Sequence, residues 1–194
     1  ILACVPWGWR NYRALGEAYF IRSNLGLELH VGNHAGAHGD IDVSDARRSF
    51  LHPRTDLEEA EQVRSLGEAE YMRRKRQEAL AWILSNPERF AELTATRVAY
   101  FWGGPLHRSG GAPWQLLLTL LALLGAWRIF PVLSSHQRAA LWIPLVAYPL
   151  IYYVVAYMPR YGHPIRWILF LLAGAALWGP GRSDATESLP LRAP

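Results

Sequence analysis

The segment of residues 159–164, Pro-Arg-Tyr-Gly-His-Pro, carries the residue types in this sequence that are best suited to bind a charged ligand. Its donors are Arg160, Tyr161 and His163, and strongly apolar stretches lie on both sides of it. A guanidinium group holds a phosphate through two parallel hydrogen bonds, and a phenol or an imidazole adds further donors. We therefore predict that these three side chains bind a phosphate or another substrate group at the edge of a membrane. An aromatic and basic anchor at the lipid headgroups is the alternative interpretation.

Polar residues near the beginning of the chain suit the recognition of a phosphate or of sugar hydroxyls. Arg10 and Asn11 follow the aromatic segment Pro6-Trp7-Gly8-Trp9, so they either contact such a ligand or mark the point where a helix leaves the bilayer. An amide or a carboxylate can pair with two adjacent hydroxyl groups. The residues that we predict for sugar or acceptor contacts are Arg22, Asn24, Glu28 and Asn33. A structural role in fixing the polar part of the chain onto membrane helices is the alternative for this set.

Three evenly spaced histidines raise the question of a metal site. They are His30, His34 and His38, and two aspartates follow them closely. Such residues can hold a metal ion when they share one face of a helix. Glycines interspersed among them disfavour a helix, so we expect a flexible polar loop over residues 32–42 and assign neither a metal site nor a cofactor. Glu68 and Tyr71, one helical turn apart, are expected to orient this part of the chain, and no catalytic residue is assigned.

Long apolar stretches dominate the second half of the chain. It has 194 residues, of which 51% are hydrophobic, with nine Trp and nine Tyr, and this is rich for a soluble protein. Residues 109–127 and 139–159 contain no charged side chain, and at about 1.5 Å per residue each helix would reach roughly 30 Å, the thickness of a bilayer core. A third stretch, residues 167–181, spans only if the preceding residues extend it and Arg166 reaches the surface. The sequence therefore predicts three membrane helices.

Tryptophans mark the ends of these stretches, as in the aromatic belts of membrane proteins. They are Trp102, Trp114, Trp127, Trp142, Trp167 and Trp178. A soluble core of buried, leucine-rich helices is the less favoured alternative, because so many long apolar stretches in so short a segment exceed what globular proteins contain. The predicted fold class is all-α and integral to a membrane, with the C-terminal transmembrane helices of a polytopic bundle and a mainly helical extramembrane lobe. If the first two stretches both span, the lobe and Arg160 lie on the same side.

The basic residues do not indicate nucleic-acid binding, although the net charge is +4. They are scattered among carboxylates except at residues 73–76, where Arg-Arg-Lys-Arg forms a run. A run this short on a helix is typical of a solvated or membrane-facing surface. Cys4 is the one cysteine of the sequence, so no disulfide framework is expected.

Local signals divide the chain into four parts. Residues 1–5 are expected to end a truncated membrane helix, residues 6–108 to form the polar lobe, residues 109–181 to hold three transmembrane helices, and residues 182–194 to form a polar tail. Within the lobe, apolar residues alternate over residues 25–31, which predicts a short extended segment.

Helix boundaries are also readable in the lobe. Thr55 with Glu58 forms the pattern of a capping box. Asn86 followed by Pro87 predicts the start of a helix. Its apolar positions recur in steps of three and four and include one arginine, Arg97, and the sequence Gly103-Gly104-Pro105 predicts its end.

The order of several short motifs resembles that of a known enzyme family. The motifs are Pro6-Trp7 with Arg10-Asn11, Phe20-Ile21-Arg22-Ser23-Asn24-Leu25-Gly26-Leu27-Glu28-Leu29, Gly32-Asn33, His52-Pro53, Gly67-Glu68 with Tyr71, and Arg160-Tyr161 with His163-Pro164. Together they resemble the C-terminal half of bacterial polytopic membrane glycosyltransferases of the GT-C type, similar to the protein O-mannosyltransferases and the aminoarabinose transferase of lipid A. The resemblance covers most of the chain, from Pro6 to Leu177.

The resemblance implies a multi-helix enzyme of the bacterial inner membrane that moves a sugar from a polyprenyl-phosphate carrier to an acceptor at the extracytoplasmic face. The implied partners are this lipid-linked donor, membrane lipids and an acceptor whose nature the residues do not indicate. In such enzymes the catalytic acidic residue lies in the first extracytoplasmic loop, so this segment alone is expected to be inactive. A non-enzymatic membrane scaffold or assembly subunit is the main alternative, and a lipid-linked oligosaccharide ligase or flippase is a third.

Overall fold

The computed structural model describes residues 4–16, 23–107 and 112–178, and the regular secondary structure of these residues is helical. The all-α part of the predicted fold class is therefore confirmed. The helices of the described residues are α1 (Val5–Leu15), α2 (Leu25–Gly32), α3 (Ile41–Ala46), α4 (Leu57–Leu66), α5 (Glu68–Ser85), α6 (Pro87–Gly103), α7 (Ala112–Ile129), α8 (Ser135–Ala147), α9 (Leu150–Val154) and α10 (His163–Trp178), with the short 3-10 helices η2 (Phe130–Val132) and η3 (Pro159–Gly162).

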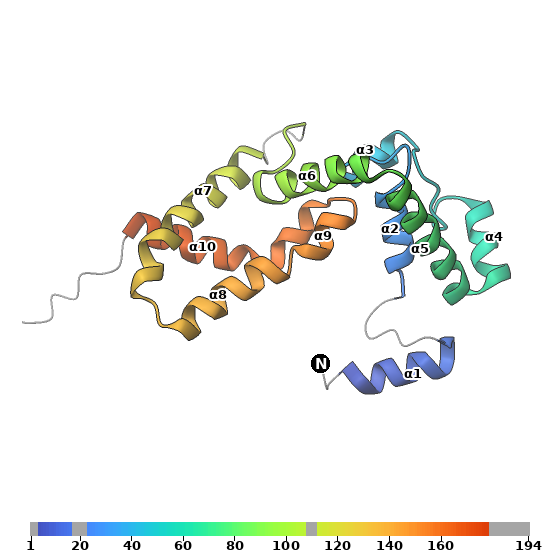
Figure 1. Ribbon diagram of the computed structural model, residues 1–194, viewed down its shortest axis with the longest axis horizontal. Coiled ribbons are helices and arrows are strands. Elements are labelled where there is room, and N and C mark those ends of the chain that lie inside the picture. The colour runs from blue at the N-terminus through green and yellow to red at the C-terminus, as the bar shows by residue number, and fades with distance from the viewer. Residues whose placement is uncertain (1–3, 17–22, 108–111, 179–194) are drawn as a thin grey trace, which may run out of the picture.

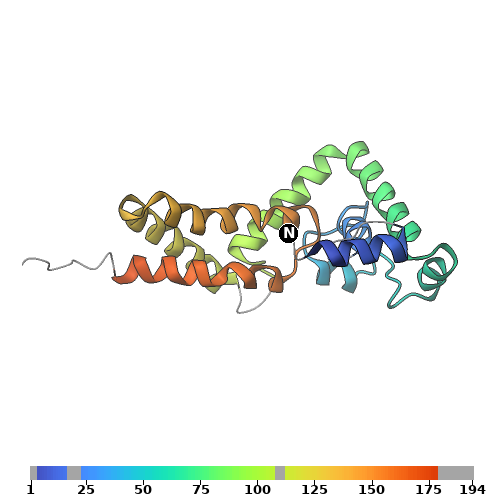
Figure 2. The same ribbon diagram turned by 90° about the horizontal axis from the view of Figure 1, so that it is seen from below.

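Two groups of helices are joined by α6 (Figure 1). Helices α2 to α5 gather at one end of the molecule, and α7 to α10 extend toward the other. Helix α7 packs along α10, and α8 lies beside this pair (Figure 2). Because α7 and α10 run away from α6 while α8 and α9 return toward it, the start of α7 and η3 lie at the same end, next to the polar lobe.

The prediction of an extended segment over residues 25–31 is wrong, because these residues form α2. A Cβ atom added to Gly26 would lie 1.9 Å from the carbonyl oxygen of Met72, and one added to Gly32 would lie 2.9 Å from the backbone nitrogen of Ala156. Helix α2 is thus enclosed by α5 on one side and by the end of α9 on another. Because α2 is packed on several faces, its apolar residues do not recur only in steps of three and four, and the sequence therefore does not show the pattern of an amphipathic helix. The small core of the lobe consists of Leu27, Val31 and Tyr71.

The ends of the lobe helices follow the predicted signals with two differences. Helix α4 begins one residue later than expected, because the carboxylate of Asp56 accepts a hydrogen bond from the backbone nitrogen of Glu59 at 2.9 Å. Helix α6 begins at Pro87 as predicted. The Asn86 amide, however, donates to the carbonyl oxygen of Trp82 at 2.9 Å, so it closes α5 instead of capping α6.

The basic run of residues 73–76 is divided between surface and interior. Its three arginines are exposed, whereas Lys75 is buried and its Nζ lies 3.0 Å from Oε1 of Glu59. The hydroxyl of Tyr71 donates to the other oxygen of the same carboxylate. The interpretation of the whole run as surface is therefore wrong at Lys75, because a carboxylate supplied by α4 offsets much of the cost of burying the amine.

The apolar helices pack through one close contact between α7 and α10. A Cβ atom added to Gly125 would lie 1.7 Å from the carbonyl oxygen of Leu172, so glycine is the residue that allows the two backbones to meet. The core around this contact consists of Phe101, Ala122, Ala126, Leu145, Tyr157, Ile165, Ile168, Leu169 and Leu172. Its first member lies on α6, so this core continues into the polar lobe.

One helical segment among the described residues is long and apolar enough to cross a membrane. It covers Pro113–Val132, and only 17% of its most apolar window is buried inside the molecule. The second predicted stretch is divided into α8 and α9 around Pro149. The third begins at His163, so the preceding residues extend it, and the described helix has 16 residues. Within the described residues, neither of these two stretches forms a helix that is long and apolar enough to cross a membrane.

Candidate functional site

The segment of residues 159–164 forms a tight corner between α9 and α10, made of η3 and the first turn of α10. Its two prolines occupy first-turn positions, where the missing N–H group costs no helical hydrogen bond. The ring of Tyr161 stacks on Tyr152 with the two centroids 4.3 Å apart. The guanidinium carbon of Arg160 lies 5.8 Å from the centroid of the Tyr161 ring, within the range of a cation–π contact. The stacked rings thereby support the exposed arginine.

Arg160 and Tyr161 line a pocket of about 770 Å³ that the corner shares with the polar lobe. We call it the Arg160 pocket, and its size suits a small molecule or headgroup. The polar residues that line it from the lobe are Asn24 just before α2, Glu28 on α2, Asp42 and Asp45 on α3, His52, Arg54 and Thr55 in the loop before α4, and Glu68 on α5. Residues predicted separately for phosphate and for sugar recognition therefore meet in one cavity.

An amide and a carboxylate lie side by side on the lobe side of the Arg160 pocket. Asn24 precedes α2 and Glu28 follows one turn later, so the two side chains lie next to each other. The Nδ2 group of Asn24 donates to Oε1 of Glu28 at 2.9 Å. An amide and a carboxylate held together in this way offer both donors and acceptors to neighbouring hydroxyl groups.

The protonation of the pocket side chains follows from their burial. Burial raises the pKa of the Tyr161 phenol, and the negative charge of Glu28 adds to this effect, so Tyr161 remains a hydrogen-bond donor at neutral pH. Burial lowers the pKa of His52, and the positive charge of Arg54 acts in the same direction. The pocket thus combines a cation and a phenol at the corner with several carboxylates and one further cation, Arg54, on the lobe side. A phosphate near Arg160 with hydroxyl groups near Glu28 fits this distribution.

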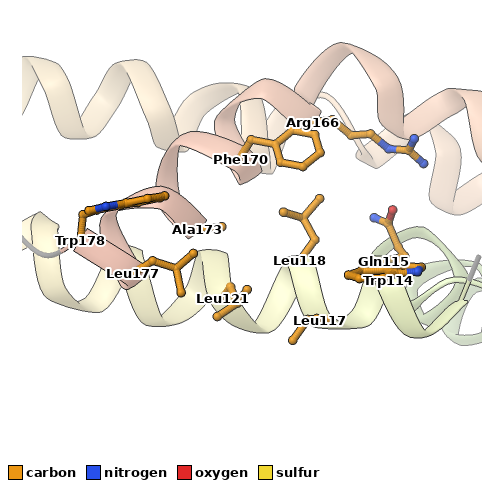
Figure 3. A pocket seen from close by; sticks show the side chains of 11 residues that line it. Trp114, Gln115, Leu117, Leu118, Leu121, Arg166, Phe170, Ala173, Leu177 and Trp178 are labelled. Atoms are coloured by element: carbon orange, nitrogen blue, oxygen red, sulfur yellow. The ribbon is translucent and has the colours of Figure 1, made fainter.

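An apolar groove lies between α7 and α10 (Figure 3). It has a volume of about 650 Å³ and is lined mainly by leucines, Phe170 and two tryptophans. Arg166 stands at one end of it, and the Nε atom of this arginine is buried without a hydrogen-bond partner among the described residues. A Cβ atom added to Gly162 in η3 would lie 3.8 Å from this Nε. The α7–α10 groove therefore runs from the corner along the apolar helices, with a cation at its head.

Several predicted site residues do not line the Arg160 pocket. His163 is exposed at the start of α10. On α1, the guanidinium of Arg10 lies 5.0 Å from the centroid of the Trp7 ring and donates to Oδ1 of Asn11 at 3.0 Å. Arg22 lies outside the described residues.

Asn33 serves the packing of the lobe against α9. It is fully buried, and its Nδ2 group donates to the carbonyl oxygens of Leu29 and Val154, each at 2.8 Å. Its Oδ1 atom accepts a hydrogen bond from Arg97 at 3.2 Å. An amide with all these partners inside the protein is not available to a ligand, and Asn33 does not line the Arg160 pocket.

Arg97 is a buried cation whose role the sequence did not indicate. Its side chain has no exposed surface, and it donates to the carbonyl oxygens of Gly32 and Val154. Burial lowers its pKa to about 10, so it stays charged at neutral pH. The sequence feature that could have indicated this role is the position of Arg97 among the apolar residues of α6. A charge on a buried helix face needs a partner inside the protein.

The three histidines of the series lie in different surroundings. Within the part of the chain that the structure describes, no group of three or more His, Cys, Asp or Glu side chains is placed to hold a metal ion. His30 belongs to the last turn of α2, and its ring stacks against His34 with the centroids 6.1 Å apart. The Nδ1 atom of His30 lies 3.6 Å from Oε2 of Glu78.

No protein-family model, no curated protein and no solved structure matches this chain.

Proposed function

We propose that this chain forms part of an integral-membrane glycosyltransferase that moves a sugar from a polyprenyl-phosphate carrier to an acceptor at the extracytoplasmic face. The observation that carries the proposal is the Arg160 pocket, where a corner between apolar helices and the polar lobe line one cavity. The order of motifs in the sequence supports the same class of enzyme.

The uncovered apolar surface of α7 to α10 supports a membrane location. Large apolar side chains exposed on it include Trp114, Leu120, Trp127, Ile143, Phe170 and Trp178. Soluble monomers rarely expose apolar patches of more than a few hundred Å², whereas a bilayer would cover such a surface. In this proposal α7 spans, and α8 with α9 and the shorter α10 accompany it, since local thinning and snorkelling side chains accommodate short helices.

The two cavities together suit a lipid with a phosphorylated sugar at one end. The isoprenoid tail lies in the α7–α10 groove, and its phosphate lies at η3, which carries Arg160 and whose Gly162 lies next to the Nε atom of Arg166. The sugar then points into the Arg160 pocket, toward Asn24 and Glu28. Bidentate hydrogen bonds from a guanidinium are the strong, directional contacts that a phosphate requires.

The reaction in this proposal is a direct displacement at the anomeric carbon of the sugar. An acceptor oxygen forms a bond to that carbon, while the bond from the carbon to the phosphate oxygen breaks and the lipid phosphate leaves. Arg160 and Arg166 stabilise the negative charge that develops on the leaving phosphate. The carboxylate that takes the proton of the acceptor hydroxyl is expected, from the resemblance, in a loop that is not part of this chain.

The test compares two arginine variants of the full-length membrane enzyme that contains this chain. Lipid binding is measured by native mass spectrometry with a polyprenyl phosphate, and transfer is measured with the polyprenyl-phosphate sugar. Arg160→Ala is expected to weaken lipid binding by about tenfold or more, the equivalent of one charge-assisted hydrogen bond, and to reduce transfer. Arg138→Ala, which removes an exposed arginine in the first turn of α8, is expected to change neither.

Other outcomes separate the alternatives. A scaffold or assembly subunit would bind the lipid no better with Arg160 than without it, and would show no transfer. A ligase or flippase would bind the carrier but would not use the monosaccharide donor. Cleavage of the polar lobe by a protease added on the cytoplasmic side would contradict the proposed orientation.

A further inference from the structure

A second polar pocket lies between α3, α6 and the segments that flank them. Its volume is about 420 Å³, which falls within the range of small-molecule sites. Its polar lining residues are His38, Asp40, Arg47, Arg89, Thr96 and His107. We call it the His107 pocket. It shares no lining residue with the Arg160 pocket, so it requires an explanation of its own.

A buried carboxylate holds the imidazole of His107 in place. Asp40 is only 1% exposed, and its Oδ1 atom accepts a hydrogen bond from the backbone nitrogen of Asp42 at 2.9 Å. Its Oδ2 atom lies 3.1 Å from Nε2 of His107. The His107 side chain is 41% exposed and its ring packs edge-on against Tyr100 with the centroids 5.7 Å apart. Because Nε2 faces Asp40, Nδ1 is the ring nitrogen that a ligand can reach.

Two arginines from different segments line the same cavity. Arg47 follows α3, and its Nη1 lies 3.3 Å from Nε2 of His38. Arg89 in the first turn of α6 donates from Nη2 to the carbonyl oxygen of Ala37 at 3.4 Å, and its Nη1 lies 2.8 Å from Oε2 of Glu92. The Arg89–Glu92 pair is largely exposed. Such pairs contribute little to stability, so an anionic ligand with better geometry can displace Glu92.

Positive charge outweighs negative charge in the His107 pocket. Burial lowers the pKa of His38, and the positive charges of Arg47 and Arg89 act in the same direction. The guanidinium groups of Arg47 and Arg89 are therefore both close enough to His38 to affect its charge. The acidic side chain among the described lining residues is Asp40, whose oxygens are already engaged by Asp42 and His107. The planar donors of two arginines suit a tetrahedral oxyanion better than a neutral ligand.

We propose that the His107 pocket binds the phosphate group of a small soluble molecule. Arg47 and Arg89 donate to the phosphate oxygens. Because Nε2–H of His107 faces Asp40, Nδ1 of the neutral ring accepts a hydrogen bond from the hydroxyl group of the monoprotonated phosphate. The remaining volume of the pocket accommodates the polar group that carries the phosphate. This site does not depend on the proposed glycosyltransferase function, because its residues are separate from those that contact the lipid-linked donor.

The test is a titration of the full chain in detergent with inorganic phosphate and with pyrophosphate, followed through the imidazole NMR signals. The signals of His38 and His107 are expected to shift saturably, while that of the exposed His136 on α8 stays constant. Arg47→Ala combined with Arg89→Ala is expected to weaken the affinity by about tenfold or more. Arg64→Ala removes an exposed arginine on α4 that pairs with Glu61, and is expected to leave the affinity unchanged.

Three results would overturn the proposal. They are the absence of a saturable shift in the unmodified protein, an unchanged affinity in the double variant, and a shift of His52 in place of His38 and His107. The last result would assign the phosphate to the Arg160 pocket, which His52 lines. If the double alanine variant does not fold, Arg47→Gln with Arg89→Gln replaces it, and the titration of the unmodified protein decides independently. A negative result here leaves the lipid-binding assay of the Arg160 pocket unaffected.

Discussion

The Nη1 atom of Arg97 on α6 lies 3.2 Å from Oδ1 of Asn33, the residue that follows α2. The same guanidinium donates to the carbonyl oxygens of Gly32 and Val154, which are the last residues of α2 and α9. The C-terminal ends of two helices carry partial negative charge, and here both meet one buried cation. Arg97 therefore joins the polar lobe to the helix that leads into the Arg160 corner.

Arg97→Ala is expected to lower the free energy of unfolding by about 3 kcal/mol or more. The substitution leaves a buried amide and the carbonyl ends of two helices without their donor, and unsatisfied buried groups are costly. Chemical denaturation in detergent measures the change. Arg73→Ala is the matched control, because Arg73 is exposed on α5 and pairs with Glu70. That variant is expected to stay within about 0.5 kcal/mol of the unmodified protein. Equal stability of the two variants would contradict the joining role.

Local signals along the chain predicted much of the helix pattern. The start of α6 at Pro87 and its end at Gly103 follow from proline and glycine, which act on the backbone within a few residues. Arg160 and Tyr161 were predicted for a phosphate, and Asn24 and Glu28 were predicted separately for a sugar or an acceptor. All four residues line one pocket.

Local sequence patterns did not predict the contacts between segments that are far apart in the sequence. The burial of Lys75 depends on Glu59, which comes from another helix. The helical state of residues 25–31 depends on two glycines that admit the backbones of α5 and α9. His163 was grouped with Arg160 by proximity in sequence, but the turn of η3 into α10 leaves it outside the pocket. In each case the tertiary neighbour determined the outcome.

Acidification is expected to destabilise the polar lobe through His30 and His34. Burial lowers the pKa of both side chains below the ordinary value of 6.5. Between the folded and the unfolded pKa, the unfolded chain binds protons that the folded chain does not, so stability is lost as the pH falls below 6.5. Denaturation curves at a series of pH values measure this loss.

Histidine variants isolate this effect from the titration of carboxylates. His30→Gln and His34→Gln are each expected to make the free energy of unfolding depend less on pH in the range just below 6.5. His136→Gln changes an exposed residue in the first turn of α8 and is expected to preserve the slope. If all three variants keep the slope of the unmodified protein, the buried histidines are not its source.

Gly125→Ala is expected to destabilise the contact between α7 and α10. The added methyl group would lie 1.7 Å from the carbonyl oxygen of Leu172, so the helices must separate, and overpacking of this kind typically costs about 1–3 kcal/mol. Gly174→Ala is the matched control, because a Cβ atom there meets nothing within 4 Å. That control is expected to be neutral or slightly stabilising, since alanine favours a helix more than glycine does. Thermal unfolding of both variants decides, and equal melting temperatures would contradict the close contact.

Gly174→Leu is expected to obstruct the α7–α10 groove without unfolding the protein. Gly174 lines this groove, and the space around it is open, so a leucine side chain there would occupy volume that the proposed isoprenoid tail requires. Binding of a polyprenyl phosphate is therefore expected to weaken by about tenfold, the equivalent of roughly 1.4 kcal/mol of lost contacts. Ala175→Leu is the control of equal size. Ala175 lines a neighbouring hollow with Ile129 and Leu133 and does not line the α7–α10 groove, so its variant should bind the lipid normally. Native mass spectrometry in detergent measures both variants, and equal affinities would show that the lipid tail lies elsewhere on the apolar surface.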